Sequence, residues 1–497
     1  MKSLEAVFGP NSALVEELYE QYKQQADSVP AHWKKYFDEL NGIDPEDAAT
    51  EQILPDTAKT NGVSAEAPAA KEKTPEKEPQ KKKTKEAPKN AELEQIKGVA
   101  TKIVENMDES LSIPTATSLR VLPVKMMIED RTIINRHLQK RNEPKASFTH
   151  FICWAVIRAM QKYPTINHSY YTDNSGHFRV KPDQVNLGIA VDITNKDGSR
   201  SLVVPNIKGV DKMNFKEFLH AFAELVDKAR NGKLQIEDFQ GTTISITNPG
   251  MIGTVSSVPR LMTGQGAIIA TGAIDYPAEY QNMSREVLNQ LGISKVMTMT
   301  CTYDHRIIQG AESGSFLQYI NSLLSGKEGF YDKIFSDLEI PYDPIPYGED
   351  SYAGPFGGKM NTLEQDKRAI GVWRLINMYR MRGHVLANLD PLEKEPGYNP
   401  ELDLAYYGLS LWDLDREFYC GKLHPSGRAT LREIIKKLRD TYCENIGADY
   451  MHLLDLEERR WLRETMESTG NEPVLTKEDK RQILHKLNQA MAFEEFL

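Results

Sequence analysis

The sequence is poor in cysteine, and its few thiols lie far apart. Its 497 residues include four cysteines, and none of them forms a CxxC pair. Closely spaced cysteines mark disulfide-rich secreted domains and zinc sites. We therefore expect reduced thiols, as in a cytoplasmic protein, at Cys153, Cys301, Cys420 and Cys443. The histidines form no HExxH or HxxxH pattern, so no metal site is predicted.

Long hydrophobic runs and an excess of positive charge are absent as well. No apolar stretch approaches the roughly 20 residues that span a bilayer, so we expect no membrane segment. The N-terminus has acidic residues early and lacks the apolar core of a signal peptide, which again favours a cytoplasmic location. The formal net charge of −10 argues against nucleic acid as the main partner.

Composition divides the chain into five parts. Amphipathic helical spacing alternates with segments that have few large apolar residues, and the latter are typical of linkers. The predicted parts are a helical segment at 1–42, a disordered Pro/Ala/Lys/Glu-rich linker at 43–92, an α+β domain at 93–340, a Pro/Tyr/Gly-rich linker at 341–365 and a mainly helical part at 366–497.

Periodicity predicts the main elements of the central domain. Helical spacing predicts helices at 125–141, 148–164, 214–234 and 312–326. Short apolar runs predict strands at 185–193, 201–207, 242–248, 267–274 and 296–303. An NKDG turn joins the first two strands and indicates a hairpin. Asn231–Gly232 is the predicted helix stop.

The C-terminal part is dominated by helical patterns. These predict helices at 367–389, 431–443, 454–467 and 477–497. The last pattern has no C-cap and stops within its repeat. We therefore expect the sequence to be a piece of a longer polypeptide.

Two polar residues at predicted strand ends could carry chemistry. His305 follows the strand at 296–303 and lies between Asp304 and Arg306, whose charges could orient an imidazole. Thr247 ends another strand, directly before an Asn-Pro-Gly turn. A base and a hydroxyl donor are what thioester exchange requires. Spacing alone leaves open whether they meet, and a histidine at a strand end can also be structural.

The ordered motifs of the central domain resemble a known family. They are NLGIAVDI, LVVPNI, DKARNGKL, GTTISITNPGMIGT, QGAIIATGAI and TYDHRIIQGA. The segment from about 91 to 340 resembles the catalytic domain of 2-oxoacid dehydrogenase acyltransferases, especially dihydrolipoamide succinyltransferases. The resemblance implies the chloramphenicol acetyltransferase-like α+β fold. It also implies coenzyme A as a substrate and a homotrimer with active sites between subunits.

The resemblance assigns roles to residues of two motifs. His305 matches the catalytic histidine, and Thr247 matches the hydroxyl residue that stabilises the oxyanion. Asp304, Arg306 and Gln309 would support the site. Most family members have Asp at the position of Gln309, and glutamine supplies no charge for a salt bridge. The form DHRIIQGAESG resembles that of multifunctional 2-oxoglutarate dehydrogenases typified by actinobacteria, in which an acyltransferase domain is fused to a thiamine-dependent decarboxylase.

The flanking segments resemble parts of that decarboxylase component. They are the first 40 residues and the tail from about 366. No GDG motif followed by the Asn-rich thiamine diphosphate motif is present. We therefore expect the chain to end before the thiamine-dependent domain, so that thiamine diphosphate and Mg belong only to a full-length parent. His384 falls in the early helical part, where a structural or regulatory role is expected.

A lipoyl domain is not expected in this sequence. Lys228 lies in a DKA motif, but within a helical pattern and not at the hairpin tip that lipoylation requires. The lipoyl group would then come from the lipoyl domain of another acyltransferase protein, with dihydrolipoamide dehydrogenase as a further partner. The resulting hypothesis is succinyl transfer to coenzyme A. The alternatives are a non-catalytic trimeric scaffold, which Gln309 favours, and an antibiotic acetyltransferase, which would not need the flanks.

Overall fold

The computed structural model divides the chain into two compact units, 1–108 and 109–497. It describes residues 8, 12–41, 99–194, 200–341, 343–346, 348, 362–390, 398–472 and 474–497. The predicted linker at 43–92, most of the one at 341–365 and the NKDG turn lie outside the described residues.

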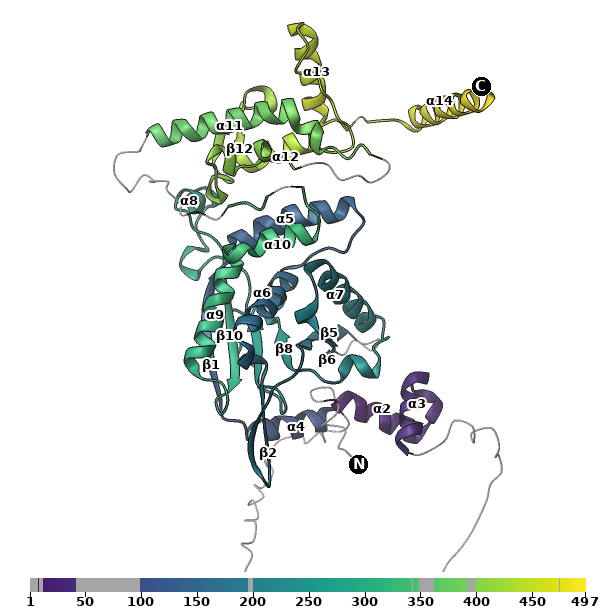
Figure 1. Ribbon diagram of the computed structural model, residues 1–497, viewed down its shortest axis with the longest axis vertical. Helices are drawn as coiled ribbons and strands as arrows, with labels where there is room; N and C mark the ends of the chain where they lie inside the picture. The colour runs from purple at the N-terminus through teal and green to yellow at the C-terminus, as the bar shows by residue number, and fades with distance from the viewer. Residues whose placement is uncertain are drawn as a thin grey trace, which may run out of the picture. The chain divides into compact units, whose positions relative to one another are not determined.

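The first unit contains a pair of helices that pack through aromatic side chains. Helices α2 (Ser12–Gln24) and α3 (Ala31–Asn41) occupy the segment where helical spacing predicts helices (Figure 1). Trp33 and Phe37 are buried, and their ring centroids lie 5.6 Å apart. Tyr22 packs on Phe37 and donates its hydroxyl hydrogen to the Asp38 carboxylate. Helix α4 (Val99–Ser110) spans the boundary between the units.

A six-stranded mixed sheet is the centre of the second unit. Its strands are β1 (Thr115–Pro123), β4 (Leu187–Ile189), β7 (Asn206–Ile207), β8 (Ile244–Thr247), β9 (Ala267–Thr271) and β10 (Val296–Asp304), in the spatial order β1-β10-β9-β8-β4-β7. Strand β10 runs antiparallel to both of its neighbours, whereas β9, β8 and β4 run parallel to one another. Consequently β8 and β10 end at opposite edges of the sheet.

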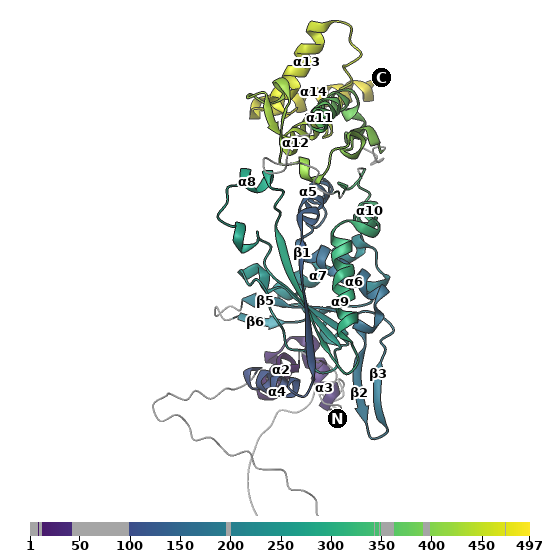
Figure 2. The same ribbon diagram turned by 90° about the vertical axis from the view of Figure 1, so that its left-hand side faces the viewer.

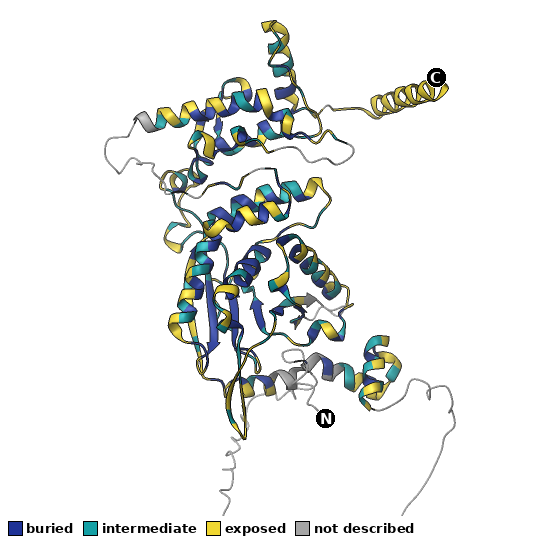
Figure 3. Ribbon diagram, viewed as in Figure 1, coloured by how far each residue is buried: buried dark blue, intermediate teal, exposed yellow. Residues whose placement is uncertain are grey.

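Helices cover this sheet and bury an aromatic core (Figures 1 and 3). The helices of this region are α5 (Lys125–Lys140), α6 (Phe148–Lys162), α7 (Phe215–Arg230), α9 (Gly310–Leu324) and α10 (Phe330–Asp337), and the short α8 (Arg285–Gln290) lies away from the sheet. The Trp154 ring of α6 stacks on Phe218 of α7 at 5.6 Å between centroids. Asn214 caps α7 in a reciprocal capping box with Glu217, and the helix ends at Asn231 as predicted.

The predicted hairpin is present, but each of its strands is broken. Its outer halves, β5 (Val191–Thr194) and β6 (Arg200–Val203), form a separate ribbon that projects from the main sheet (Figure 2). Pro205 has no N–H to continue the ladder, although its carbonyl accepts from the Ile189 N–H at 2.8 Å. The patterns did not indicate β1 or the exposed hairpin of β2 (Ser169–Asp173) and β3 (Gly176–Val180).

The C-terminal part has the four predicted helices. They are α11 (Thr362–Arg382), α12 (Leu431–Tyr442), α13 (Leu456–Thr469) and α14 (Lys477–Phe496), with a two-stranded sheet of β11 (Glu417–Tyr419) and β12 (Arg428–Thr430). A buried ion pair joins α11 to α13: Arg380 donates to both Glu467 carboxylate oxygens at 2.6 and 3.0 Å. The Tyr442 hydroxyl of α12 donates to the same carboxylate at 2.9 Å.

The four cysteines are free and buried, in agreement with the reduced thiols expected. Burial raises the pKa of the Cys301 thiol to about 12, which makes it a poor nucleophile at neutral pH. Among the described residues, no helix combines the length and the apolar character that crossing a membrane requires.

The buried ion pair predicts a large effect of Glu467. Both side chains are at most 6% exposed, so Glu467→Met leaves the Arg380 charge buried without its partner. We expect the free energy of unfolding, measured by urea denaturation, to fall by about 3–5 kcal/mol. Restoring neutrality with Arg380→Met in the double variant should recover part of the loss. The exposed pair formed by Glu464 of the same helix supplies the control, and Glu464→Met should leave unfolding unchanged.

A close backbone approach beside the end of β10 predicts a second effect. Gly266 accepts from the Asp304 N–H at 2.9 Å, and a Cβ at this glycine would lie 1.7 Å from the His168 carbonyl oxygen. Gly266→Ala should therefore lower the unfolding free energy by at least about 2 kcal/mol. Gly314→Ala in α9 is the matched control, because its Cβ would meet nothing within 4 Å. A helical alanine should stabilise there by about 0.5–1 kcal/mol, and equal effects of the two substitutions would contradict this account.

Candidate active site

His305 is held at the end of β10 by its backbone. Its N–H donates to the Pro114 carbonyl at 3.0 Å, just before β1 begins. The imidazole is exposed and lies edge-on to the buried Tyr303 ring, with 5.6 Å between centroids. No described residue hydrogen-bonds to its ring nitrogens. The strand end therefore fixes the position of the His305 backbone, and the imidazole remains open to a ligand or a second chain.

A buried carboxylate supports the turn that carries His305. Asp304 is 2% exposed and accepts from the Arg306 side chain at 2.6–3.1 Å and from the Arg306 N–H at 3.0 Å. This bond and the charge of Asp304 raise the pKa of Arg306. Asp304 and Arg306, which flank His305 in the sequence, thus form a bidentate ion pair with each other. A bidentate pair of this kind fixes orientation better than a single bond.

The exposed hairpin of β2 and β3 completes the surroundings of this turn. The Arg306 guanidinium lies over the Tyr170 ring of β2 at 3.7 Å from its centroid. Tyr170 in turn contacts His177, with 2.6 Å between its hydroxyl and Nδ1. Arg179 of β3 donates to the Ile307 carbonyl at 2.7 Å. Sequence patterns missed these residues because they lie more than a hundred positions before the DHR motif.

Gln309 acts in this structure through its backbone. It is the N-cap of α9, and its carbonyl accepts from the N–H groups of Glu312 and Ser313 at 3.1 Å. Its side chain is exposed and makes no capping bond. An aspartate at this position would carry a negative charge, and no side-chain contact of Gln309 takes its place. The ion pair of the motif is the one between Asp304 and Arg306.

Thr247 ends β8 at a tightly packed turn. Asn248, the next residue, donates from Nδ2 to the Thr149 hydroxyl at 3.1 Å. A Cβ on Gly250 would lie 2.3 Å from the Gly272 backbone, so only glycine fits. The following segment is apolar yet exposed, with Met251 84% and Ile252 76% accessible. Such a patch is typical of a surface that meets another protein.

The structure does not bring Thr247 and His305 together within one chain. Thr247 is level with Ala270 of β9 and hence with Thr300 of β10, five residues before His305. At about 3.3 Å per residue and two strand spacings of about 4.8 Å, the two residues lie roughly 19 Å apart. This distance exceeds the reach of any hydrogen bond. A site that uses both residues requires a second copy.

Two other residues considered in the sequence analysis, Lys228 and His384, lie in helices. Lys228 lies in α7 and pairs with Glu224 at 2.8 Å, one turn away, as its helical pattern predicts. His384 lies in the short 3-10 helix Gly383–Leu386, away from strand ends. No group of three or more potential metal ligands occurs among the residues that the structure describes.

Comparisons with known proteins match two segments of the chain. Residues 88–330 match the family model of the 2-oxoacid dehydrogenases acyltransferase (catalytic domain), and residues 5–42 match the 2-oxoglutarate dehydrogenase N-terminus. The first match confirms the predicted α+β, chloramphenicol acetyltransferase-like fold class.

Similar curated proteins combine both families. A multifunctional 2-oxoglutarate metabolism enzyme of Mycolicibacterium vanbaalenii is 43% identical over 525 residues, which cover 99% of this chain and 41% of that protein. The 2-oxoglutarate dehydrogenase E1/E2 component of Corynebacterium glutamicum is 40% identical over 510 residues, with the same coverage. The chain thus spans about two fifths of the length of these relatives.

Among solved structures, a probable dihydrolipoamide acetyltransferase from Listeria monocytogenes is 26% identical, with a TM-score of 0.41. The alignment covers 48% of this chain and 97% of that one. Residues 88–330 are thus similar to the acyltransferase catalytic domain of 2-oxoacid dehydrogenases and residues 5–42 to the 2-oxoglutarate dehydrogenase N-terminus, and the chain is similar over almost its whole length to part of the multifunctional 2-oxoglutarate metabolism enzymes.

Proposed function

We propose that this chain transfers a succinyl group from dihydrolipoamide to coenzyme A, as part of a 2-oxoglutarate dehydrogenase. The proposal rests on one observation above all: an exposed His305 at a strand end of an acyltransferase domain whose relatives act in 2-oxoglutarate metabolism. The succinyl-dihydrolipoamide would be presented by the lipoyl domain of another acyltransferase protein. After the transfer, dihydrolipoamide dehydrogenase would reoxidise the dihydrolipoamide that remains. The whole assembly would work in the cytoplasm.

His305 is the proposed general base. Its neutral ring nitrogen takes the proton of the coenzyme A thiol, and the thiolate attacks the thioester carbon. The Thr247 hydroxyl donates to the oxyanion of the tetrahedral intermediate. The intermediate collapses to succinyl-CoA, and the protonated His305 returns the proton to the departing dihydrolipoamide sulfur. Asp304 and Arg306 are positioning residues, because they hold the turn without reaching the reacting atoms.

We propose that each active site is shared between two copies in a homotrimer. Within one copy, the strand directions separate His305 from Thr247. The exposed apolar residues directly after Thr247 supply a surface that a neighbouring copy could cover. A closed ring of copies then repeats the same contact at every site. Thiamine diphosphate and Mg would act only in a longer parent chain, on a different domain.

A scaffold without catalysis is the second candidate. Its support is the uncharged Gln309, whose side chain makes no capping bond at the start of α9. In this role the domain would only organise decarboxylase subunits. A folded homotrimer with no transfer activity, unimproved by Gln309→Asp, would favour this role over catalysis.

Mixed oligomers provide the sharpest test of the shared site. Alone, His305→Ala should lower succinyl transfer by about 10²–10⁴-fold, and Thr247→Val by about 10²–10³-fold. In trimers reassembled from equal amounts of the two inactive variants, about a quarter of the sites combine an intact histidine with an intact threonine. We therefore expect activity to return to about a quarter of the wild-type value, as measured by succinyl-CoA formation from succinyl-dihydrolipoamide without thiamine cofactor.

Two controls make this test decisive. Each variant mixed with itself should stay inactive, and the trimer should persist in sedimentation experiments. If both single variants are inactive and mixing restores no activity, the shared site is contradicted, while His305 remains the proposed base. Full activity of His305→Ala would contradict the catalytic assignment itself.

A further inference from the structure

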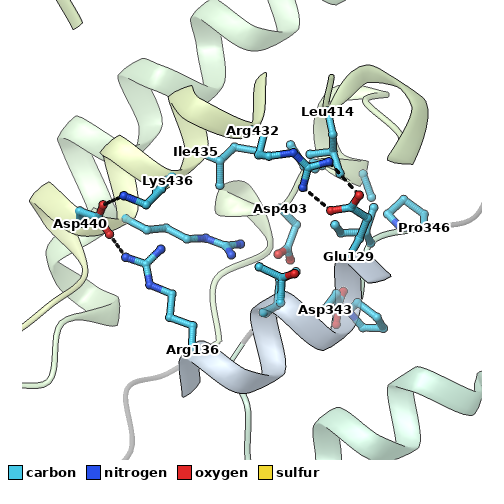
Figure 4. Close-up of a pocket in the computed structure, with 17 residues that line it drawn as sticks. Glu129, Arg136, Asp343, Pro346, Asp403, Leu414, Arg432, Ile435, Lys436 and Asp440 are labelled. Atoms are coloured by element: carbon cyan, nitrogen blue, oxygen red, sulfur yellow. Dashed lines mark hydrogen bonds and ion pairs between the residues drawn. The ribbon is translucent and has the colours of Figure 1, made fainter. Parts of the chain in front are cut away.

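The second unit contains a cavity of about 400 Å³, and none of the candidate active-site residues lines it (Figure 4). Its walls come from α5 of the acyltransferase domain, from the segment 343–346 and from the C-terminal helical part, including α12. The walls are mainly apolar, with Ile133, Leu404 and Ile435 among the lining side chains. A cavity of this size and character suits a small organic ligand.

Most charges around the cavity neutralise one another. Glu129 accepts from Arg432 at 2.7 Å, and Asp440 pairs with both Arg136 and Lys436 (Figure 4). Two of these pairs, Glu129–Arg432 and Arg136–Asp440, connect α5 to α12. Each of the two acids has a cationic partner, so neither carboxylate is free to attract a ligand cation.

Two further carboxylates at the cavity differ from these pairs. Asp343 accepts from the Tyr398 hydroxyl, and its backbone N–H donates to Asp403. Asp403 is 8% exposed, and its Oδ2 has no hydrogen-bond partner among the described residues. Burial raises the pKa of Asp403 to about 6, with a further contribution from the charge of Asp343, while the neighbouring Tyr398 hydroxyl and the charge of Arg439 oppose the shift. A buried carboxylate oxygen without a partner is costly, unless a donor arrives with a ligand.

We propose that this cavity binds an organic ligand with a primary ammonium group and an apolar body. The ammonium would donate to Asp403 Oδ2 beside Asp343, and the body would fill the apolar walls between α5 and α12. A cation matches the two neighbouring acids, Asp343 and Asp403, and Arg439 is a cation that already lines the same cavity. Because α5 and α12 both line the cavity, the ligand would stabilise the contact between the acyltransferase domain and the C-terminal helical part.

A matched series of probes tests the charge of the ligand. 4-Phenylbutylammonium, 4-phenylbutanol and 4-phenylbutanoate share one apolar body and differ in the polar end. Calorimetric titration of the full chain at pH 7.5 should show saturable binding of the ammonium, with the alcohol at least about tenfold weaker. At pH 5, binding of the ammonium should weaken because Asp403 is then largely protonated. No saturable ammonium binding, or equal binding of the alcohol or the acid, would overturn the proposal.

Variants test the location. Asp403→Asn keeps the shape and should weaken ammonium binding by at least about tenfold. Asp440→Asn removes a charge from the same cavity at the α12 pairs and should change binding by less than about threefold. If Asp403→Asn fails to fold, Ile133→Trp, which fills the cavity from α5, should abolish binding; unchanged affinity in either folded variant would refute the site. None of these readouts depends on acyl transfer, so the proposed function and this site can fail separately.

Discussion

The opposed directions of β8 and β10 determine what one copy of this chain can do. Both strands end in a residue with suitable chemistry, but one runs parallel and the other antiparallel to β9 between them. The two carboxyl ends therefore lie at opposite edges of the sheet. Hydrogen-bond register fixes this separation, and no side-chain rotation can remove it. If both residues serve one site, as we propose, the need for a second copy follows from backbone topology alone.

In both candidate site segments, the backbone of a glycine packs closely against the backbone of a second segment of the chain. Gly266 lies against the His168 carbonyl below the end of β10, and Gly250 lies against Gly272 beyond the end of β8. Neither position has room for a Cβ. This close backbone contact restrains both turns in addition to their side-chain bonds, Asp304–Arg306 and Asn248–Thr149. Rigid strand ends that carry unpaired groups are suited to catalysis, because no reorganisation is needed when substrate binds.

The sequence predicted the helices and the sheet strands whose period is clear, including α7 with its stop at Asn231–Gly232 and the strand before His305. It missed β1, an edge strand in which only Leu122 is buried and the apolar residues Leu119 and Val121 are exposed. The mutual clamp of Asp304 and Arg306 was accessible from their adjacency. The Tyr170 ring under Arg306 was not, since only the folded β2–β3 hairpin brings it there. Local sequence patterns indicate the periodicity of an element and the positions of turns, whereas contacts between residues a hundred positions apart depend on packing.

Helix α5 shows why the sequence also gave no sign of the cavity. One face of this helix buries Met127 and Ile134 in the acyltransferase core, as its period indicates. Its other face carries Glu129, Arg136 and Lys140, which pair with acids and bases of the C-terminal part. Apolar burial thus stabilises the domain, while ion pairs make much of its contact with the next part. Partly exposed pairs are weak and screened by salt, so this contact is the place in the second unit where a small bound ligand could change stability most.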